Sequence, residues 1–174
     1  LQVPGTHYEY NDVRVNLLSY ALLLLFRRPL PEVAKEALLD PCGWSQDWSW
    51  NGYRNSHVTI DGEEMWSVSG GGHWGGGLFV DALDLARFGL LYLNKGRWGE
   101  RQLLSQEWID LTAKACPIEP RYGFMWWLNT DGLMVPSAPH DAIFALGAGG
   151  DLVWVDYKHD LVAVARWLGD DHHD

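Results

Sequence analysis

Basic side chains are scarce in this sequence. Its 174 residues contain 13 Lys and Arg residues against 23 Asp and Glu residues, so the formal net charge is −10 at pH 7. Proteins that bind nucleic acid use clustered basic side chains to neutralise the phosphates. We therefore expect no nucleic-acid partner.

Cysteine is scarce too, and patterns typical of metal binding are absent. Cys42 and Cys116 stand far apart, no CxxC pair occurs, and the seven histidines form no HExxH motif. We therefore predict no metal site and no other cofactor. A disulfide between the two cysteines is one interpretation, but two separate small apolar side chains are favoured.

No apolar run is long enough to be read as a membrane span. The run from Val15 to Phe26 is about a dozen residues long and contains Asn16, whereas a spanning helix needs roughly 20 apolar residues. No small-residue cleavage site follows it, so a buried helix explains the run better than a signal peptide does. We expect no membrane partner.

Glycine is abundant between residues 70 and 77, but the nucleotide-binding context is missing. Gly70, Gly72 and Gly75 fit GxGxxG, yet no second parallel strand and no suitably spaced acidic residue follow. No Lys follows the glycines, which excludes a P-loop, and no Gly-x-Ser-x-Gly elbow occurs anywhere. The glycines are better explained by positive φ angles and close backbone packing.

Aromatic residues are the abundant class, with 11 Trp, 7 Tyr and 5 Phe. Packing between elements accounts for most of them, and a few tryptophans lining a substrate cleft are the sharper alternative. A carbohydrate-binding module is a third interpretation, and it depends on the tryptophan count alone.

Local signals predict four helices. Asn11 and Asp12 are good N-caps, Pro31 suits a first helical turn, Ser105 is another N-cap, and Gly96 is a natural stop. With the apolar periodicity, these signals predict helices over residues 12–26, 31–40 and 81–94, and a short one after Ser105.

The second half of the chain changes to strand patterns. Residues 44–56 are polar, aromatic and broken by glycine, and we predict a loop there. The predicted strands are 58–60, 65–68, 122–129, 142–146, 152–156 and 161–168, the last two joined as a tight hairpin.

This order of elements predicts an α+β fold rather than alternating βαβ units. We expect residues 1–116 to be mainly helical and loop, residues 117–169 to form antiparallel strands, and residues 170–174 to be a frayed tail.

The segment before the first helix is the most informative for chemistry. Tyr10 and Asp12 stand at the predicted N-terminus of the helix, where the helix dipole is positive. Such a field favours a phenolate and suits a tyrosine that carries protons. Packing by Tyr10 and simple capping by Asp12 remain an equal alternative.

These residues carry a family resemblance. Residues 4–12, Pro-Gly-Thr-His-Tyr-Glu-Tyr-Asn-Asp, followed by an apolar helix, resemble the Tyr-x-Asn segment of class C β-lactamases and related esterases and peptidases. Four further stretches resemble segments of the same family in the same order: 39–44, 75–88, 122–126 and 147–150. Together the five matches span nearly the whole chain and imply a β-lactamase/transpeptidase-like fold, present in part.

The resemblance implies catalytic roles for particular positions. In the family a serine of Ser-x-x-Lys attacks a carbonyl, and the lysine and the tyrosine of Tyr-x-Asn transfer its proton. Tyr10 matches that tyrosine. The backbone N–H of Ala148 aligns with an oxyanion-hole donor, and Gly147 and Gly149 would let the strand approach the substrate.

At two places the sequence differs from the family pattern, and these differences indicate which branch of the family it resembles. Asp12 stands where asparagine is usual, and an ionised aspartate cannot donate to a substrate carbonyl. Ala145 and Leu146 stand where a cation and a hydroxyl residue are usual, so the group that holds a β-lactam carboxylate is missing. The resemblance then favours esterases and 6-aminohexanoate-dimer hydrolases, with small ester or amide substrates. His73, Trp74 and Trp127 could border the substrate pocket or only pack near it.

The nucleophile motif does not occur in the sequence. No serine has a lysine three positions later, and the family places Ser-x-x-Lys before Tyr-x-Asn. We therefore expect the nucleophile, and the N-terminal part of the same fold, to lie outside this chain, and the chain alone to be inactive. The alternative is a non-catalytic binding or regulatory module that kept the fold.

Overall fold

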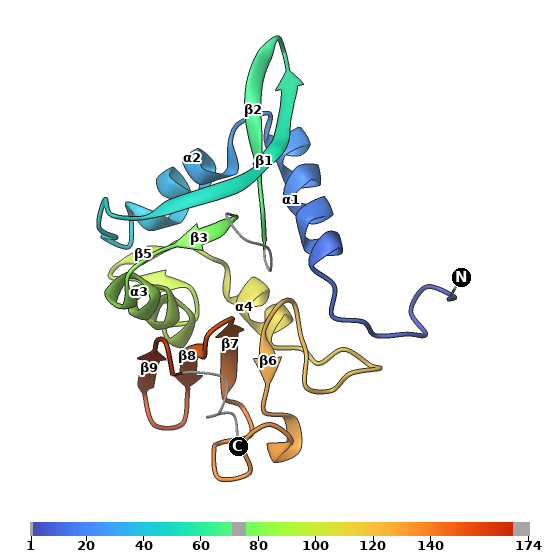
Figure 1. The fold of residues 1–174 in the computed structure, drawn as a ribbon. Helices are drawn as coiled ribbons and strands as arrows, with labels where there is room; N and C mark the ends of the chain where they lie inside the picture. The colour runs from blue at the N-terminus through green and yellow to red at the C-terminus, as the bar shows by residue number, and fades with distance from the viewer. Residues whose placement is uncertain (1, 71–75, 169–174) are drawn as a thin grey trace. The chain divides into compact units, whose positions relative to one another are not determined.

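The computed structural model describes residues 2–70 and 76–168, and it divides the chain into two compact units (Figure 1). We call Glu9–Asp81 the helix–hairpin unit. Leu1–Tyr8 together with Ala82–Asp174 form the second, the sheet unit. We describe each unit by itself.

The helix–hairpin unit begins with α1 (Asp12–Phe26), whose predicted range is confirmed. Asn11 is the N-cap, and its side chain accepts a hydrogen bond from the Arg14 N–H at 3.1 Å. The C-cap is Arg27, whose backbone has the left-handed αL conformation. Its N–H donates to the Leu23 carbonyl at 2.8 Å. Pro29 then prevents any continuation.

A second helical stretch follows at once, as predicted. It starts as α2 (Leu30–Ala34) with Pro31 in the first turn, where a missing N–H costs nothing. It continues as the wider π-helical segment η1 (Lys35–Leu39) and ends before Pro41.

A three-stranded antiparallel sheet completes this unit. β1 (Ser49–Ile60) lies between β2 (Glu63–Val68) and β3 (Gly77–Phe79). The loop predicted over residues 44–56 is therefore wrong from Ser49 onward. β1 lacks a clean alternation because both of its faces are partly exposed, and its register shifts between Gly52 and His57.

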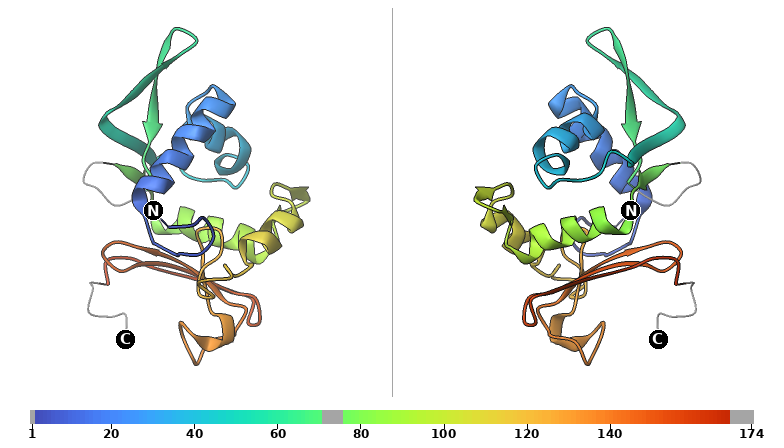
Figure 2. Two further views of the ribbon diagram at one scale, coloured as in Figure 1. Left: turned by 90° about the vertical axis from the view of Figure 1, so that its right-hand side faces the viewer. Right: turned by 90° about the vertical axis from the view of Figure 1, so that its left-hand side faces the viewer.

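The larger sheet of the sheet unit has four antiparallel strands in the order β6-β7-β8-β9. They are β6 (Trp127–Leu128), β7 (Ile143–Gly147), β8 (Asp151–Asp156) and β9 (Leu161–Ala165). The helix α3 (Ala82–Leu93) covers one face of β8 and β9 (Figure 2). A Cβ at Gly89 would lie 2.6 Å from Val162 Cγ1, so only glycine permits this close approach.

Shorter elements connect α3 to the strands. They are the hairpin of β4 (Arg97–Trp98) and β5 (Arg101–Gln102), the helix α4 (Gln106–Thr112) and the 3-10 turn η2 (Thr130–Gly132). Ser105 caps α4, as predicted, by accepting the Trp108 N–H at 3.1 Å.

Two predicted strands are shorter than expected, each for a local reason. The strand predicted over 122–129 is limited to Trp127–Leu128, because Met125 has a φ of 65° and Phe124 donates its N–H to the Thr112 carbonyl instead. The strand predicted over 161–168 ends at Ala165, because Trp167 has a φ of 59°.

The core of the sheet unit lies between α3, α4 and the covered face of the sheet. Its buried side chains are Tyr92, Ile109, Trp126, Leu128, Ile143 and Val155. Each such side chain contributes about 1.5–3 kcal/mol through burial. This core fixes β7, whose far end reaches Gly147.

Cys42 and Cys116 do not form a disulfide; Cys42 is buried in one unit, and Cys116 is partly buried in the other. The prediction of two separate small side chains is confirmed. Among the described residues, none of the helices has the length and apolar character that crossing a membrane requires.

Candidate active-site residues

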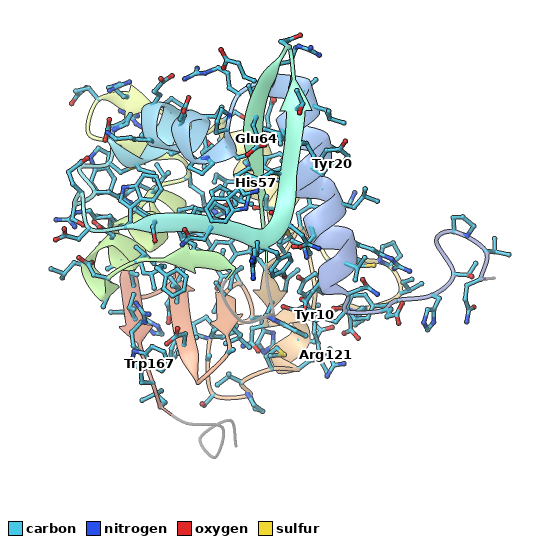
Figure 3. All side chains as sticks on the ribbon, turned by 45° about the horizontal axis from the view of Figure 1, so that its top comes forward. Tyr10, Tyr20, His57, Glu64, Arg121 and Trp167 are labelled. Atoms are coloured by element: carbon cyan, nitrogen blue, oxygen red, sulfur yellow. The ribbon has the colours of Figure 1, made fainter. Side chains whose placement is uncertain are left out.

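Tyr10 lies immediately before α1, and its side chain is 57% exposed (Figure 3). The next two residues take different roles. Asn11 uses its side-chain oxygen to cap the helix, whereas Asp12 is the first helical residue and is partly buried. Asp12 therefore places a carboxylate in the first turn, where the helix dipole stabilises a negative charge.

Asn16, one turn further along α1, anchors this helix within its unit. Its side-chain oxygen accepts the Gly70 N–H at 2.9 Å, and its amide donates to the Tyr53 hydroxyl at 3.3 Å. A Cβ at Gly70 would lie 2.1 Å from Val15 Cγ1, so glycine is required where α1 packs. The sequence reasoning missed this anchor, although a lone amide in an apolar helical run was a usable signal.

Gly147, Ala148 and Gly149 lie at the turn between β7 and β8. Gly147 pairs with Asp151, and Gly149 and Gly150 have φ angles of 79° and 75°. These positive angles favour glycine, so the turn itself accounts for Gly149. A Cβ at Gly149 would also approach the Trp167 ring to 3.3 Å.

The edge of β7 next to β6 is open over its last residues. β6 pairs only with Ile143 and Phe144. Over Ala145–Gly147, the described residues provide no strand partner on that side, and Gly147 and Ala148 are exposed. Backbone groups at this edge are therefore available to an extended ligand.

Ala145 and Leu146 bring no charge to this edge. Ala145 packs against the core of the sheet unit, and Leu146 is half-buried on the opposite face. No cationic side chain occupies either position, which is the arrangement that the sequence indicated.

Trp127 lies on the sheet face opposite α3. It pairs across the strands with Phe144, which pairs with Trp154, and the Tyr122 ring stacks edge-on against Trp127 at 5.0 Å. The face opposite α3 thus carries a row of aromatic side chains. Packing within this row accounts for Trp127.

The predicted site residues therefore fall into separate groups. Tyr10 and Asp12 belong to the helix–hairpin unit, and Gly147, Ala148, Gly149 and Trp127 belong to the sheet unit. His73 and Trp74 lie outside the described residues. Within the described ranges, no three His, Cys, Asp or Glu side chains are grouped so that they could hold a metal ion.

A comparison with protein families identifies the family of the chain. The model of the family described as "Beta-lactamase" matches residues 1–167. The chain belongs to the β-lactamase family. No curated protein matches the sequence.

Solved structures of β-lactamase-like proteins share this fold. A protein of Bacillus anthracis proposed to be a 6-aminohexanoate-dimer hydrolase matches with a TM-score of 0.70 and 23% identity. The match covers 94% of this chain and 39% of that one. A protein of Bacteroides dorei DSM 17855 proposed to be a β-lactamase matches with a TM-score of 0.65, 16% identity, and coverage of 94% and 52%.

These matches confirm the predicted α+β, β-lactamase/transpeptidase-like fold, present in part. The β-lactamase-family chain described here spans about two fifths to one half of the length of these two structures.

Proposed function

We propose that this chain forms part of the active site of a serine hydrolase that cleaves small esters or amides through an acyl-enzyme. The nucleophile Ser-x-x-Lys would come from outside these 174 residues. The observation that carries the proposal is the open edge of β7, where the exposed Ala148 follows three residues without a strand partner on that side in the described structure.

In the proposed reaction the serine oxygen attacks the substrate carbonyl carbon and gives up its proton. Tyr10, exposed at the start of α1, carries that proton together with the lysine of Ser-x-x-Lys. The carbonyl oxygen becomes an oxyanion, to which the Ala148 N–H donates a hydrogen bond. When the intermediate collapses, the carbon–oxygen or carbon–nitrogen bond breaks and the leaving group takes the proton. Water then hydrolyses the acyl-enzyme.

The proposed substrate class follows from the uncharged edge. Ala145 and Leu146 offer no cation to a substrate carboxylate, so a β-lactam antibiotic would lose its usual ionic partner. Neutral esters and short amides need no such partner. The similarity to the Bacillus anthracis protein, which is proposed to be a 6-aminohexanoate-dimer hydrolase, is consistent with this choice.

A non-catalytic binding module is the second candidate. Asp12 favours it, because a carboxylate stands where the family uses a donor amide, and the neighbouring Asn11 side chain is occupied by capping. In this case Tyr10 would have no effect on any turnover.

The test uses the parent protein that contains this chain. We expect a fluorophosphonate probe to label its Ser-x-x-Lys serine, and p-nitrophenyl esters or short amides to be hydrolysed faster than a cephalosporin. Tyr10→Phe should lower kcat by about 10²–10⁴-fold, whereas Tyr20→Phe, a partly exposed tyrosine on α1, should not.

Three results would contradict the proposal. One is a parent protein that no probe acylates, which favours the binding module. Another is a cephalosporin as the best substrate, which would mean that Ala145 does not exclude β-lactams. The third is acylation of any serine in the isolated 174-residue chain.

A further inference from the structure

A pocket opens at the end of the sheet unit where β7 begins. Residues 137–141 form one wall, and residues 158–159 in the β8–β9 turn form the other, around a volume of about 600 Å³. Both segments lie at the lower end of the strands in Figure 1. A strand rises about 3.3 Å per residue, so Gly147 at the other end of β7 is roughly 13 Å from Ile143.

A buried asparagine fixes the first wall. Asn129 is fully buried, and its amide nitrogen donates to the carbonyls of Val135, Ala138 and Pro139 at 3.0–3.2 Å. Its side-chain oxygen accepts the N–H groups of Met134 and Val135 at 3.1 and 2.8 Å. Because the amide nitrogen carries two hydrogens, one of them is shared between two carbonyls. The Asn129 side chain thus contacts five backbone groups of this loop.

A buried aspartate fixes the second wall. Asp156 is 2% exposed and accepts both the backbone N–H of His159 at 3.0 Å and its Nδ1 at 2.8 Å. Burial acts to raise the pKa of Asp156, but its hydrogen bonds from His159 outweigh burial and hold the pKa below its ordinary value. Because Nδ1 faces Asp156, the Nε2 edge of the exposed His159 ring is turned away from that carboxylate.

The lining is less acidic than the chain as a whole. In a protein of net charge −10, the titratable residues lining this pocket are one lysine, two histidines and one aspartate: Lys158, His140, His159 and Asp141. Ser137 adds a hydroxyl donor, and Ala138 and Pro139 add an apolar patch. Donors beside an apolar patch suit a molecule with an oxyanion at one end.

We propose that this pocket binds a small organic oxyanion, a carboxylate or a phosphate ester. Lys158 contacts the charged group from one wall, and His140 and Ser137 donate hydrogen bonds to it from the other. The organic part packs on Ala138 and Pro139. Asp141 opposes the anion and limits its affinity. This site does not depend on the hydrolase reaction proposed above.

The experiment titrates the parent protein that contains this chain with inorganic phosphate, phenyl phosphate and benzoate at constant ionic strength. Binding is followed by the amide NMR shifts of residues 137–141 and 158–159. Phenyl phosphate should bind more tightly than inorganic phosphate, because only the ester reaches the apolar patch. If benzoate binds as well, the pocket recognises the negative oxygens that carboxylates and phosphates share. If only the phosphates or only benzoate bind, the natural ligand belongs to that compound class.

Charge variants decide whether the site is specific. Lys158 is exposed, so Lys158→Gln leaves the fold intact and should weaken binding about tenfold. Asp141→Asn should tighten binding several-fold. Lys114→Gln removes an exposed lysine outside the pocket and should change nothing.

Opposite results overturn the proposal. They are equal weakening by Lys158→Gln and Lys114→Gln, weaker binding by Asp141→Asn, or shifts spread over the whole surface. Each would mean that the anions respond only to general surface charge.

Discussion

The two ends of β7 differ in how they present polar groups. At the Gly147 end the groups belong to the backbone, exposed on an open edge beside a glycine turn. At the Ile143 end they belong to side chains, held by buried Asn129 and Asp156. The first end depends on φ angles that favour glycine, and the second depends on satisfied buried hydrogen bonds. Substitutions at the Gly147 end should therefore lower the free energy of unfolding through backbone strain, and substitutions at the Ile143 end should lower it through lost hydrogen bonds.

The largest effect should follow Asn129→Ala. This change leaves three carbonyls and two N–H groups without their partner, and each buried group left unsatisfied costs about 1–3 kcal/mol. We expect the free energy of unfolding in urea to fall by at least about 3 kcal/mol. Asn94→Ala, at an exposed position, is the control and should stay within about 0.5 kcal/mol. If Asn129→Ala lowers the free energy of unfolding no more than the control does, the Asn129 side chain is not needed to hold the pocket wall at residues 137–141.

An intermediate effect should follow Gly149→Ala. The φ of 79° places alanine in the left-handed region, which costs about 1–2 kcal/mol. Gly147→Ala is the matched change in the same segment without a positive φ, and it should cost less. Urea unfolding of both variants measures the difference. Equal losses would show that crowding, rather than φ, limits this turn.

The smallest effect is a pH dependence at Asp156. Because its folded pKa lies below its ordinary value, Asp156 contributes stability that is present above the unfolded pKa of about 3.9 and is lost as pH falls through the folded pKa. The urea midpoint difference between the unmodified chain and Asp156→Asn should therefore shrink as the pH falls below about 4. Asp160→Asn, exposed in the same turn, is the control. A difference that grows on acidification would contradict the hydrogen bond with His159.

Local signals predicted the helices well because their limits are set by neighbouring residues. Asn11 caps α1, Pro29 follows its end, and Ser105 caps α4. The first part of β1, from Ser49 to Ser56, was predicted as a loop because its pairing depends on β2 and β3 rather than on alternation within its own sequence. Short strands were overextended where single φ angles, as at Met125, redirect the chain.

Segments that resemble the family predict Tyr10 and Ala148 as site residues, and these two assignments stay predictions. Asn129 and Asp156 could not be found in this way. The partners of Asn129 are backbone groups of a following loop, and the His159 ring reaches Asp156 only once the hairpin has formed.

Because β6 is short, the length of any ligand that binds beside β7 as an added strand is limited. Only Ala145–Gly147 is open on that side in the described structure, which at about 3.3 Å per residue amounts to roughly 10 Å. An extended ligand can pair with β7 over a length of two or three residues, because β6 lies at one end of the open stretch and the glycine turn lies at the other. The same limit makes the edge a poor template for another chain of the same kind, so it can stay open without promoting fibrous self-association.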